Sequence, residues 1–451
     1  GEAALLNVTY QSSTTLEALV PFGLSPGEYD LIVKDPIDQG QEQVVTLENA
    51  FTVTQGTGLF NSNGPFGGHT RELAIHPDNS EIVFVIVELV GLFRTVDGGE
   101  NWELVFYNGA TDNRFVKILL NEGGDFSVFA PAQDGVYRSD QNGDPGTWYR
   151  MGIQESGDQP SDFEISYGLE TTYFYCAIHT TLYLSIDNGE TWTDIGDESW
   201  QEVPFDLAVD TFNPRLVYAA LGNDSLYVAE GTEDLIFSWG NPINYFQKDQ
   251  GGGELRVIAA DPNFTEMLWV GTWEKGLHRS TNRGAGFHPI SIAGQVNENE
   301  IRSISFDPRQ KRIFIGECDI YYCDYDNIEN GEQSWQWINL TVNNQGANYA
   351  VIGQDGIIYT SHAGVRKSID GGETWQYQSD GITGIQMLRI LVSPQDPDRV
   401  IGVSDNDGVF GTHDGGNSWY NHTLDFGPAG APPYFDAAFN TGDAQTIYAA
   451  L

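Results

Sequence analysis

The chain has 451 residues and carries 64 Asp and Glu against 21 Lys and Arg, which gives a formal net charge of −43. Nucleic-acid binding needs clustered cations, so this balance excludes nucleic acid from the predicted partners. Hydrophobic residues make up 40% of the chain, enough for a packed core, and 52 Gly with 19 Pro indicate an all-β chain with many turns. The sequence contains neither a signal peptide nor an apolar run long enough for a membrane-spanning helix.

We interpret the acidic excess as a solvated surface that keeps the protein soluble by charge repulsion. Specific binding of Ca²⁺ at several surface sites is the alternative, although no EF-hand-like loop occurs. The eight histidines are scattered and lack metal-ligand spacing. We therefore expect no metal centre and no cofactor. Cys318 and Cys323 flank a predicted short hairpin, and the sequence leaves open whether they pair.

Residues 1–55 differ from the rest of the chain and are predicted to form strands separated by Pro and Gly turns. Two stretches carry a resemblance: residues 24–33 read Leu-Ser-Pro-Gly-Glu-Tyr-Asp-Leu-Ile-Val, and residues 47–53 read Leu-Glu-Asn-Ala-Phe-Thr-Val. They resemble the C-terminal part of an IPT/TIG domain, a small immunoglobulin-like β-sandwich. The resemblance implies a remnant of a spacer module from a secreted or surface protein. The chain begins in mid-pattern, so we expect it to be a piece of a longer protein or larger assembly.

Residues 56–70 are interpreted as a linker, and residues 71–451 as a repeat domain. In the repeats an apolar strand returns at intervals of about 40–50 residues, the length of one four-stranded β-propeller blade. We count eight complete units and a ninth that is cut off at Leu451. Two arrangements remain open. Residues 56–66 could complete a ring of about nine blades, or the chain could continue into a larger ring or a second propeller.

Four units share the turn Ser/Thr-x-Asp-x-Gly-x-x-Trp, and a degraded copy at residues 280–287 has Asn and Phe in place of Asp and Trp. The Asp can accept backbone N–H bonds inside the turn, and the Trp can bury its ring beneath it. We therefore expect both positions to be structural. The pairs are Asp97 and Trp102, Asp187 and Trp192, Asp370 and Trp375, and Asp414 and Trp419.

These turns resemble the Asp-box (BNR) repeat superfamily, which includes sialidases, glycoside hydrolases of family 74, a photosystem assembly factor and sortilin-type receptors. The resemblance implies a large β-propeller with its boxes at the periphery, away from the axis. It carries over no catalytic residue. The Arg-Ile-Pro strand of sialidases is absent, and two family 74 carboxylates cannot be assigned among 64 acidic residues.

Arginines recur at one position of the repeat, six residues before the proline that ends the first strand of a unit. They are Arg71, Arg256 and Arg302, with Arg114 and Arg389 at nearly the same place. Innermost strands line a propeller's channel, so we expect these arginines near the axis. Pairing with carboxylates of a neighbouring blade would make them pins of the ring. The alternative is a binding site for carboxylated or sulfated sugars, because Arg grips carboxylates bidentately. His69, two residues before Arg71, would lie on the same channel-mouth loop.

The sequence predicts an all-β protein of the cell exterior or cell surface. Binding or scaffolding of an extracellular protein or polysaccharide is the first functional prediction. A polysaccharide-active enzyme, either a glycoside hydrolase or a lyase, with its site at the channel mouth is the alternative. Two or three convergent acids, or a Tyr/His/Arg cluster, in a wide cleft at that mouth would favour the enzyme, whereas a mouth with only arginine–carboxylate pairs would favour the scaffold.

Overall fold

The computed structural model describes residues 6–12, 15–19, 27–38, 41–53 and most of 64–450. Within the last range the described chain omits 65, 108–114, 122–124, 154–158, 170, 223, 247–252, 291, 293–299, 308, 310, 317–319, 326–337, 340–348, 363, 386, 394, 405–408, 422–435 and 441–442. The chain divides into two compact units, residues 1–62 and 63–451. No helix in the described part is both long and apolar enough to cross a membrane.

The first unit contains two antiparallel hairpins. One joins β1 (Leu6–Ser12) to β2 (Thr15–Leu19), and the other joins β3 (Gly27–Asp38) to β4 (Gln41–Val53). The β-strands expected in residues 1–55 are therefore present. Membership of the IPT/TIG family stays a prediction.

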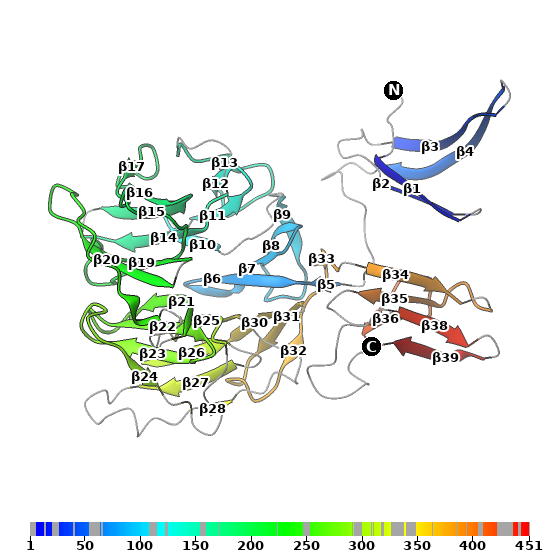
Figure 1. The fold of residues 1–451 in the computed structure, drawn as a ribbon. Helices are drawn as coiled ribbons and strands as arrows, with labels where there is room; N and C mark the ends of the chain where they lie inside the picture. The colour runs from blue at the N-terminus through cyan, green and yellow to red at the C-terminus, as the bar shows by residue number, and fades with distance from the viewer. Residues whose placement is uncertain are drawn as a thin grey trace. The chain divides into compact units, whose positions relative to one another are not determined.

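The second unit is built of consecutive antiparallel sheets whose strands follow chain order (Figure 1). Blade 1 contains β6 (Thr70–His76), β7 (Asn79–Val87), β8 (Gly91–Thr95) and β9 (Glu103–Phe106). Blade 2 contains β10 (Lys117–Leu120), β11 (Phe126–Ala132), β12 (Gly135–Ser139) and β13 (Tyr149–Arg150). Blade 3 contains β14 (Asp162–Tyr167), β15 (Thr172–Ile178), β16 (Thr181–Ser185) and β17 (Thr193–Asp194).

Blade 4 has three strands, β18 (Pro204–Val209), β19 (Leu216–Leu221) and β20 (Ser225–Glu230), followed by the 3₁₀ helix η1 (Asn244–Phe246). Blade 5 contains β21 (Glu254–Ala260), β22 (Leu268–Trp273), β23 (Leu277–Ser280) and β24 (His288–Ile290). Blade 6 contains β25 (Ser303–Phe306), β26 (Arg312–Gly316), β27 (Ile320–Asp324) and β28 (Ile338–Asn339). Blade 7 contains β29 (Tyr349–Ile352), β30 (Ile358–His362), β31 (Gly364–Ser368) and β32 (Gln376–Tyr377).

Blade 8 contains β34 (Met387–Val392), β35 (Val400–Ser404), β36 (Val409–Thr412) and β37 (Tyr420–Asn421), and the hairpin of β38 (Asp436–Asn440) and β39 (Asp443–Ala450) follows it. The predicted all-β fold of about eight complete units and a partial ninth is confirmed.

The second strand of a blade is buried on both faces because neighbouring blades pack against each side. Residues 83–87 of β7, for example, form a continuous aliphatic and aromatic run with no solvent exposure. Between blades 2 and 3 the rings of Phe129, Phe163 and Phe174 lie against one another. The core therefore consists of successive clusters between blades.

The ring closes after seven blades. Its innermost strands are neighbours in the order β6, β10, β14, β18, β21, β25, β29 and back to β6. A short parallel pairing of β5 (Gly67–Gly68) with β33 (Thr383–Gly384) reinforces the seam. The alternative of one ring with about nine blades is wrong, because blade 8 and the following hairpin are not among the blades of this closed ring. Residues 56–63, considered above as a source of a strand, lie outside the described residues.

Side-chain hydrogen bonds cross the seam between blades 7 and 1 at several places. The hydroxyl of Tyr359 donates to the carbonyl of Ser80 at 2.9 Å, and the indole N–H of Trp102 donates to the carbonyl of Gln378 at 2.9 Å. Lys367 Nζ donates to the carbonyl of Gly98 at 2.9 Å. Tyr359 and Trp102 also belong to one buried cluster that draws on both blades.

The recurring turns are capped as the sequence predicts. In the first, Thr95 Oγ1 accepts from Gly99 N at 2.9 Å, and Asp97 Oδ1 accepts from Asn101 N at 3.0 Å. The same bonds recur in the other three turns. The expectation for the Trp side chains is wrong in part. Trp102 is buried in the cluster between blades 7 and 1, whereas the other three indoles are half-buried. Trp192 and Trp375 pack against the clusters between blades 2 and 3 and between blades 6 and 7 without being enclosed by them.

A cation just before the box makes a contact that the sequence analysis missed. Arg94 Nη1 donates to the carbonyl of Asn142 at 2.7 Å, and Arg138 Nη1 donates to the carbonyl of Asn188 at 2.9 Å. Each bond joins one blade to the turn of the next, as Lys367 does across the seam. Arg or Lys stands directly before Thr95, Ser139 and Ser368, and this recurrence is the sequence signal that could have revealed the contact.

We predict that Trp102→Ala lowers the free energy of unfolding by about 3–5 kcal/mol, since it removes a buried ring from the seam. Trp192→Ala is the matched control, because that indole is half-buried and donates to the carbonyl of Gly189 within its own turn. Its loss should be about 1–2 kcal/mol. Denaturant titration measures both values, and equal losses would contradict the special role of the seam.

Candidate functional site in the channel of the ring

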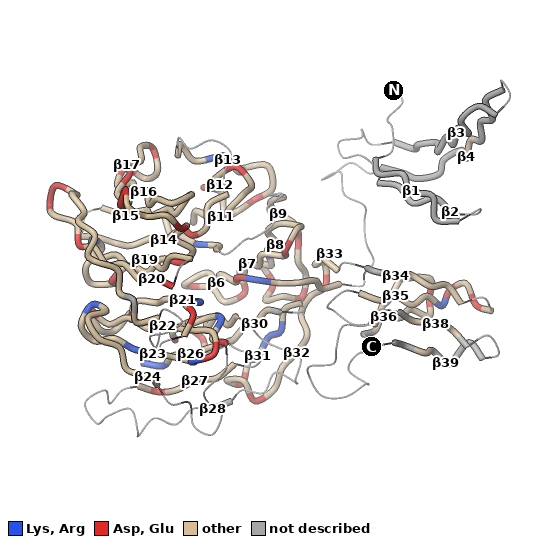
Figure 2. The backbone as a smooth tube through the Cα atoms, in the orientation of Figure 1, with Lys and Arg blue, Asp and Glu red and all other residues tan. Residues whose placement is uncertain are grey.

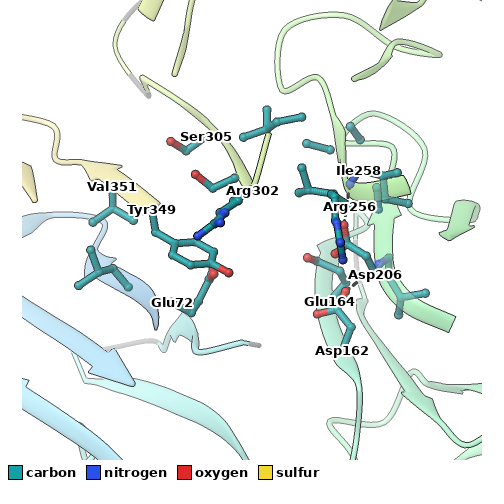
Figure 3. A pocket seen from close by; sticks show the side chains of 18 of the residues that line it. Glu72, Asp162, Glu164, Asp206, Arg256, Ile258, Arg302, Ser305, Tyr349 and Val351 are labelled. Atoms are coloured by element: carbon teal, nitrogen blue, oxygen red, sulfur yellow. Dashed lines mark hydrogen bonds between the residues drawn. The ribbon is translucent and has the colours of Figure 1, made fainter. Parts of the chain in front are cut away.

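A cavity of about 700 Å³ lies within the ring, and its walls come mainly from the first strands of the blades. Figure 3 shows side chains from several blades facing this space. Because each blade begins with its innermost strand, residues at the same place on those strands lie at similar depth in the channel. The cavity therefore collects one set of side chains near the start of the strands and another set deeper.

The first set contains His69 and Arg71. Arg71 Nη2 lies 3.0 Å from Glu88 Oε2, and His69 Nδ1 contacts the same carboxylate oxygen. Burial and the neighbouring Arg71 charge lower the pKa of His69 below its ordinary value. This histidine is therefore neutral at physiological pH.

The rest of the first set gathers around Glu300. Arg302 Nη2 lies 2.7 Å from Glu300 Oε2, and Arg256 Nε lies 3.4 Å from Glu300 Oε1. Arg256 also lies 3.4 Å from Glu254, and its guanidinium stacks over the Trp273 ring at 4.5 Å. We call His69, Arg71, Arg256 and Arg302, with their glutamate partners, the arginine mouth.

Of the six residues predicted to bind a ligand, the structure brings four together in the arginine mouth. Arg114 lies outside the described residues. Arg389 is exposed on β34, in blade 8, so its predicted place at this channel is wrong: its local sequence matches, but its strand is not in the closed ring. Arg256 with Glu300 makes the expected pin between two blades, here blades 5 and 6.

A second charged set lies deeper. It consists of Glu72, Asp162, Glu164 and Asp206 with Lys117, and we call it the acidic belt. Lys117 Nζ lies 2.6 Å from Glu164 Oε1. Figure 2 shows acidic residues throughout the blades and fewer Lys and Arg residues. Both signs of charge line this cavity.

The sequence analysis missed the acidic belt, although a repeat signal exists. Glu72 and Asp162 each stand three residues before an isoleucine, Ile75 or Ile165. Each isoleucine pairs with the second strand opposite the Thr or Ser that opens the box. Aligning the units on the box would therefore have placed both acids at one position of the innermost strand.

Two belt carboxylates connect blades. Asp162 Oδ1 accepts from Phe163 N at 2.8 Å, and its Oδ2 accepts from Leu207 N of blade 4 at 2.7 Å. Asp206 Oδ2 accepts from Ile258 N of blade 5 at 2.6 Å. These acids hold successive innermost strands side by side, so part of the belt is structural.

The belt has unusual protonation energetics. Burial raises the pKa of Glu72 to about 7. Burial and the nearby carboxylates also raise the pKa of Asp162 and of Asp206. Burial alone would lower the pKa of Lys117, but the surrounding acids, Glu164 foremost, raise it instead. In the belt, four carboxyl groups therefore share one ammonium, and a proton or a bound cation would offset the remaining negative charge.

The described residues contain no group of three or more His, Cys, Asp or Glu side chains arranged to hold a metal ion. Cys176 is a buried free thiol on β15, and Cys323 is buried on β27. Cys318 lies outside the described residues. The arrangement in the channel suits ionic and hydrogen-bonded recognition of an organic ligand.

No protein-family model matches the sequence, and no curated protein matches it. Among solved structures, an ancestral GH74 enzyme is similar at a TM-score of 0.60 with 14% identity, over 79% of this chain and 54% of that one. The chain thus spans about half the length of that enzyme. The GH74 xyloglucanase from Xanthomonas campestris matches at a TM-score of 0.38 and 12% identity, over 79% of this chain and 53% of that one. YCF48 bound to D1 peptide matches at a TM-score of 0.35 and 15% identity, over 59% of this chain and 83% of that one. At such identities the likeness concerns the fold, which is a β-propeller.

The pKa shifts predict a stability maximum on the acid side of neutrality. The folded state holds a proton on Glu72 more tightly than the unfolded chain does, so the free energy of unfolding falls as pH rises from about 4.5 to about 7. Asp187, Asp370 and Asp414 have pKa values lowered to about 2 by bonds within their turns, so stability is also lost as pH falls from about 4 to about 2.

The thermal midpoint measured from pH 2 to 8 checks this expectation. Glu72→Gln should reduce the decline of the thermal midpoint between pH 5 and pH 7. Exposed Glu100→Gln should leave the profile as it is. An unchanged decline in the Glu72 variant would show that general charge repulsion, and not this buried acid, causes it.

Proposed function

We propose that the chain is a binding or scaffolding module of the cell exterior or cell surface, and that it recognises a protein or glycan at the arginine mouth. The observation that carries the proposal is the gathering of His69, Arg71, Arg256 and Arg302 at one end of the channel. Each guanidinium is oriented by a glutamate, yet the side chains of Arg256 and Arg302 keep 37% and 40% exposure for further bonds.

The neighbouring Trp273 supports recognition. It is 38% exposed and lies beneath Arg256, so it offers an aromatic edge beside charged groups. Interfaces and sugar sites commonly combine such aromatic and arginine side chains. We also propose that the boxes belong to the Asp-box class and that residues 1–55 are an IPT/TIG-like spacer. Both assignments rest on the sequence motifs.

A polysaccharide-active enzyme is the second candidate, and Glu72 is the observation that favours it. A carboxyl with a pKa of about 7 has the property required of a general acid. The other belt acids favour a structural role. Asp162 and Asp206 accept N–H bonds from the next blade, and Glu164 pairs with Lys117.

A combined glycan array and peptide-array screen tests the first candidate. We predict that any ligand found loses about ten- to a hundredfold in affinity on Arg71→Ala or Arg302→Ala, since each removes a charge-assisted bond. Arg312→Ala is the control, because Arg312 pairs with Asp324 within blade 6 and does not line the channel. Ligands indifferent to both mouth variants would overturn the proposal.

A reducing-sugar assay on acidic and neutral polysaccharides tests the second candidate. Cleavage that disappears in Glu72→Gln would establish the enzyme. Cleavage that persists in that variant would exclude Glu72 as its acid.

A further inference from the structure

We propose that the channel binds a lysine side chain of a partner protein, with the ammonium group received by the acidic belt below the arginine mouth. This inference rests on the proposed function, since it names the chemistry of the group that enters the channel. It concerns residues deeper than the mouth arginines, and it can fail while recognition at the mouth stands.

The balance of charge in the belt carries the first step. Glu72, Asp162, Glu164 and Asp206 face a single ammonium, that of Lys117. When all are ionised, four negative charges against one positive leave an excess of three. A further cation in the channel would neutralise carboxylates that otherwise take up protons, as the raised pKa of Glu72 indicates.

Unused acceptors carry the second step. Within the described part of the chain, Glu72 makes no hydrogen bond or ion pair, and Asp206 is engaged through Oδ2 only. The Ser305 hydroxyl oxygen is buried and likewise has no hydrogen-bond partner among the described residues. Figure 3 shows Glu72 and Asp206 projecting toward the space from different blades. An ammonium with three N–H donors matches such acceptors.

The apolar residues in the cavity wall favour lysine over other cations. Val257, Ile304 and Val351 line the same cavity and are only partly buried, so an apolar surface lies beside the acids. The methylene stem of a lysine can pack on such a surface while its charged end reaches a polar site. The described acids are not arranged to hold a metal ion. A compact ammonium on a flexible stem therefore fits better than a metal ion.

The arginines of the mouth indicate which residues would flank the lysine in the partner segment. Arg71, Arg256 and Arg302 present guanidinium groups where the channel opens, and carboxylates on the ligand can share them with the resident glutamates. A partner segment with acidic residues beside the lysine would satisfy both levels of the channel. A segment whose charged residues are all lysines would be repelled by the guanidinium groups of the mouth.

The test uses the full chain and the blocked peptide acetyl-Asp-Lys-Asp-amide, with binding measured by calorimetry at pH 8. The matched probe replaces Lys by norleucine, which keeps the stem and removes the charge. We expect the lysine peptide to bind at least about tenfold more tightly. Glu72→Gln should abolish most of that preference, whereas Glu100→Gln should keep it. Binding of the lysine peptide should also weaken as pH falls below 7.

Three results would overturn the inference. The first is equal affinity for the lysine peptide and the norleucine peptide. The second is a preference for lysine that is undiminished in both Glu72→Gln and Asp206→Asn. The third is tighter binding of glucosamine, an amino sugar, than of the lysine peptide. Asp206→Asn requires a thermal melt to show that the ring is intact, because Asp206 also joins blades 4 and 5. If both peptides bind equally and depend on Arg71 and Arg302, the lysine site fails while the proposed function stands. If array ligands ignore those arginines, the proposed function itself fails.

Discussion

The packing of blade 7 against blade 1 is the constraint on which the rest of the structure depends. It decides which innermost strands share a channel and therefore which charges face each other. Tyr359, Trp102 and Lys367 make the connection with carbonyl acceptors on the other side of the seam. A ring that closed only after blade 8 or later would move the blade 6 residue Arg302 further from His69 and Arg71 of blade 1, and the arginine mouth would not form.

Within the ring, the same kinds of contact repeat from blade to blade. Hydrophobic clusters provide most of the surface buried between blades, and polar side chains fix how neighbouring blades align. At the periphery, Arg94 and Arg138 donate hydrogen bonds to the turn of the next blade. At the axis, Asp162 and Asp206 accept hydrogen bonds from the innermost strand of the next blade. Buried charges cost free energy unless they are paired. The acids at the axis are incompletely paired, which is why the channel is the place where a ligand can contribute most.

Local features of this fold could be predicted from the sequence, because turn chemistry and strand periodicity act over a few residues. The capped turns at Asp97 and its counterparts and the place of Arg71, Arg256 and Arg302 near the axis are examples. The number of blades in the ring could not be predicted from the sequence, because blade 8 carries the same box as blade 1. Closure of the ring depends on contacts between residues 269–294 positions apart in the chain. Arg389 was misplaced for that reason. The acidic belt was missed because Asp162, Glu164 and Asp206 are inconspicuous among 64 acids.

Closure at seven blades is tested most directly by a cross-link across the seam. Ser80 Oγ and Asp355 Oδ1 lie 2.7 Å apart in space and 275 residues apart in the chain. The double variant Ser80→Cys with Asp355→Cys, treated with an oxidant or with a short cross-linker that carries two thiol-reactive groups, should form one intramolecular link, seen by intact mass and by altered mobility on a denaturing gel. The single variants provide the baseline. A double variant that stays uncross-linked while folded would contradict the seven-bladed ring and the channel that it encloses.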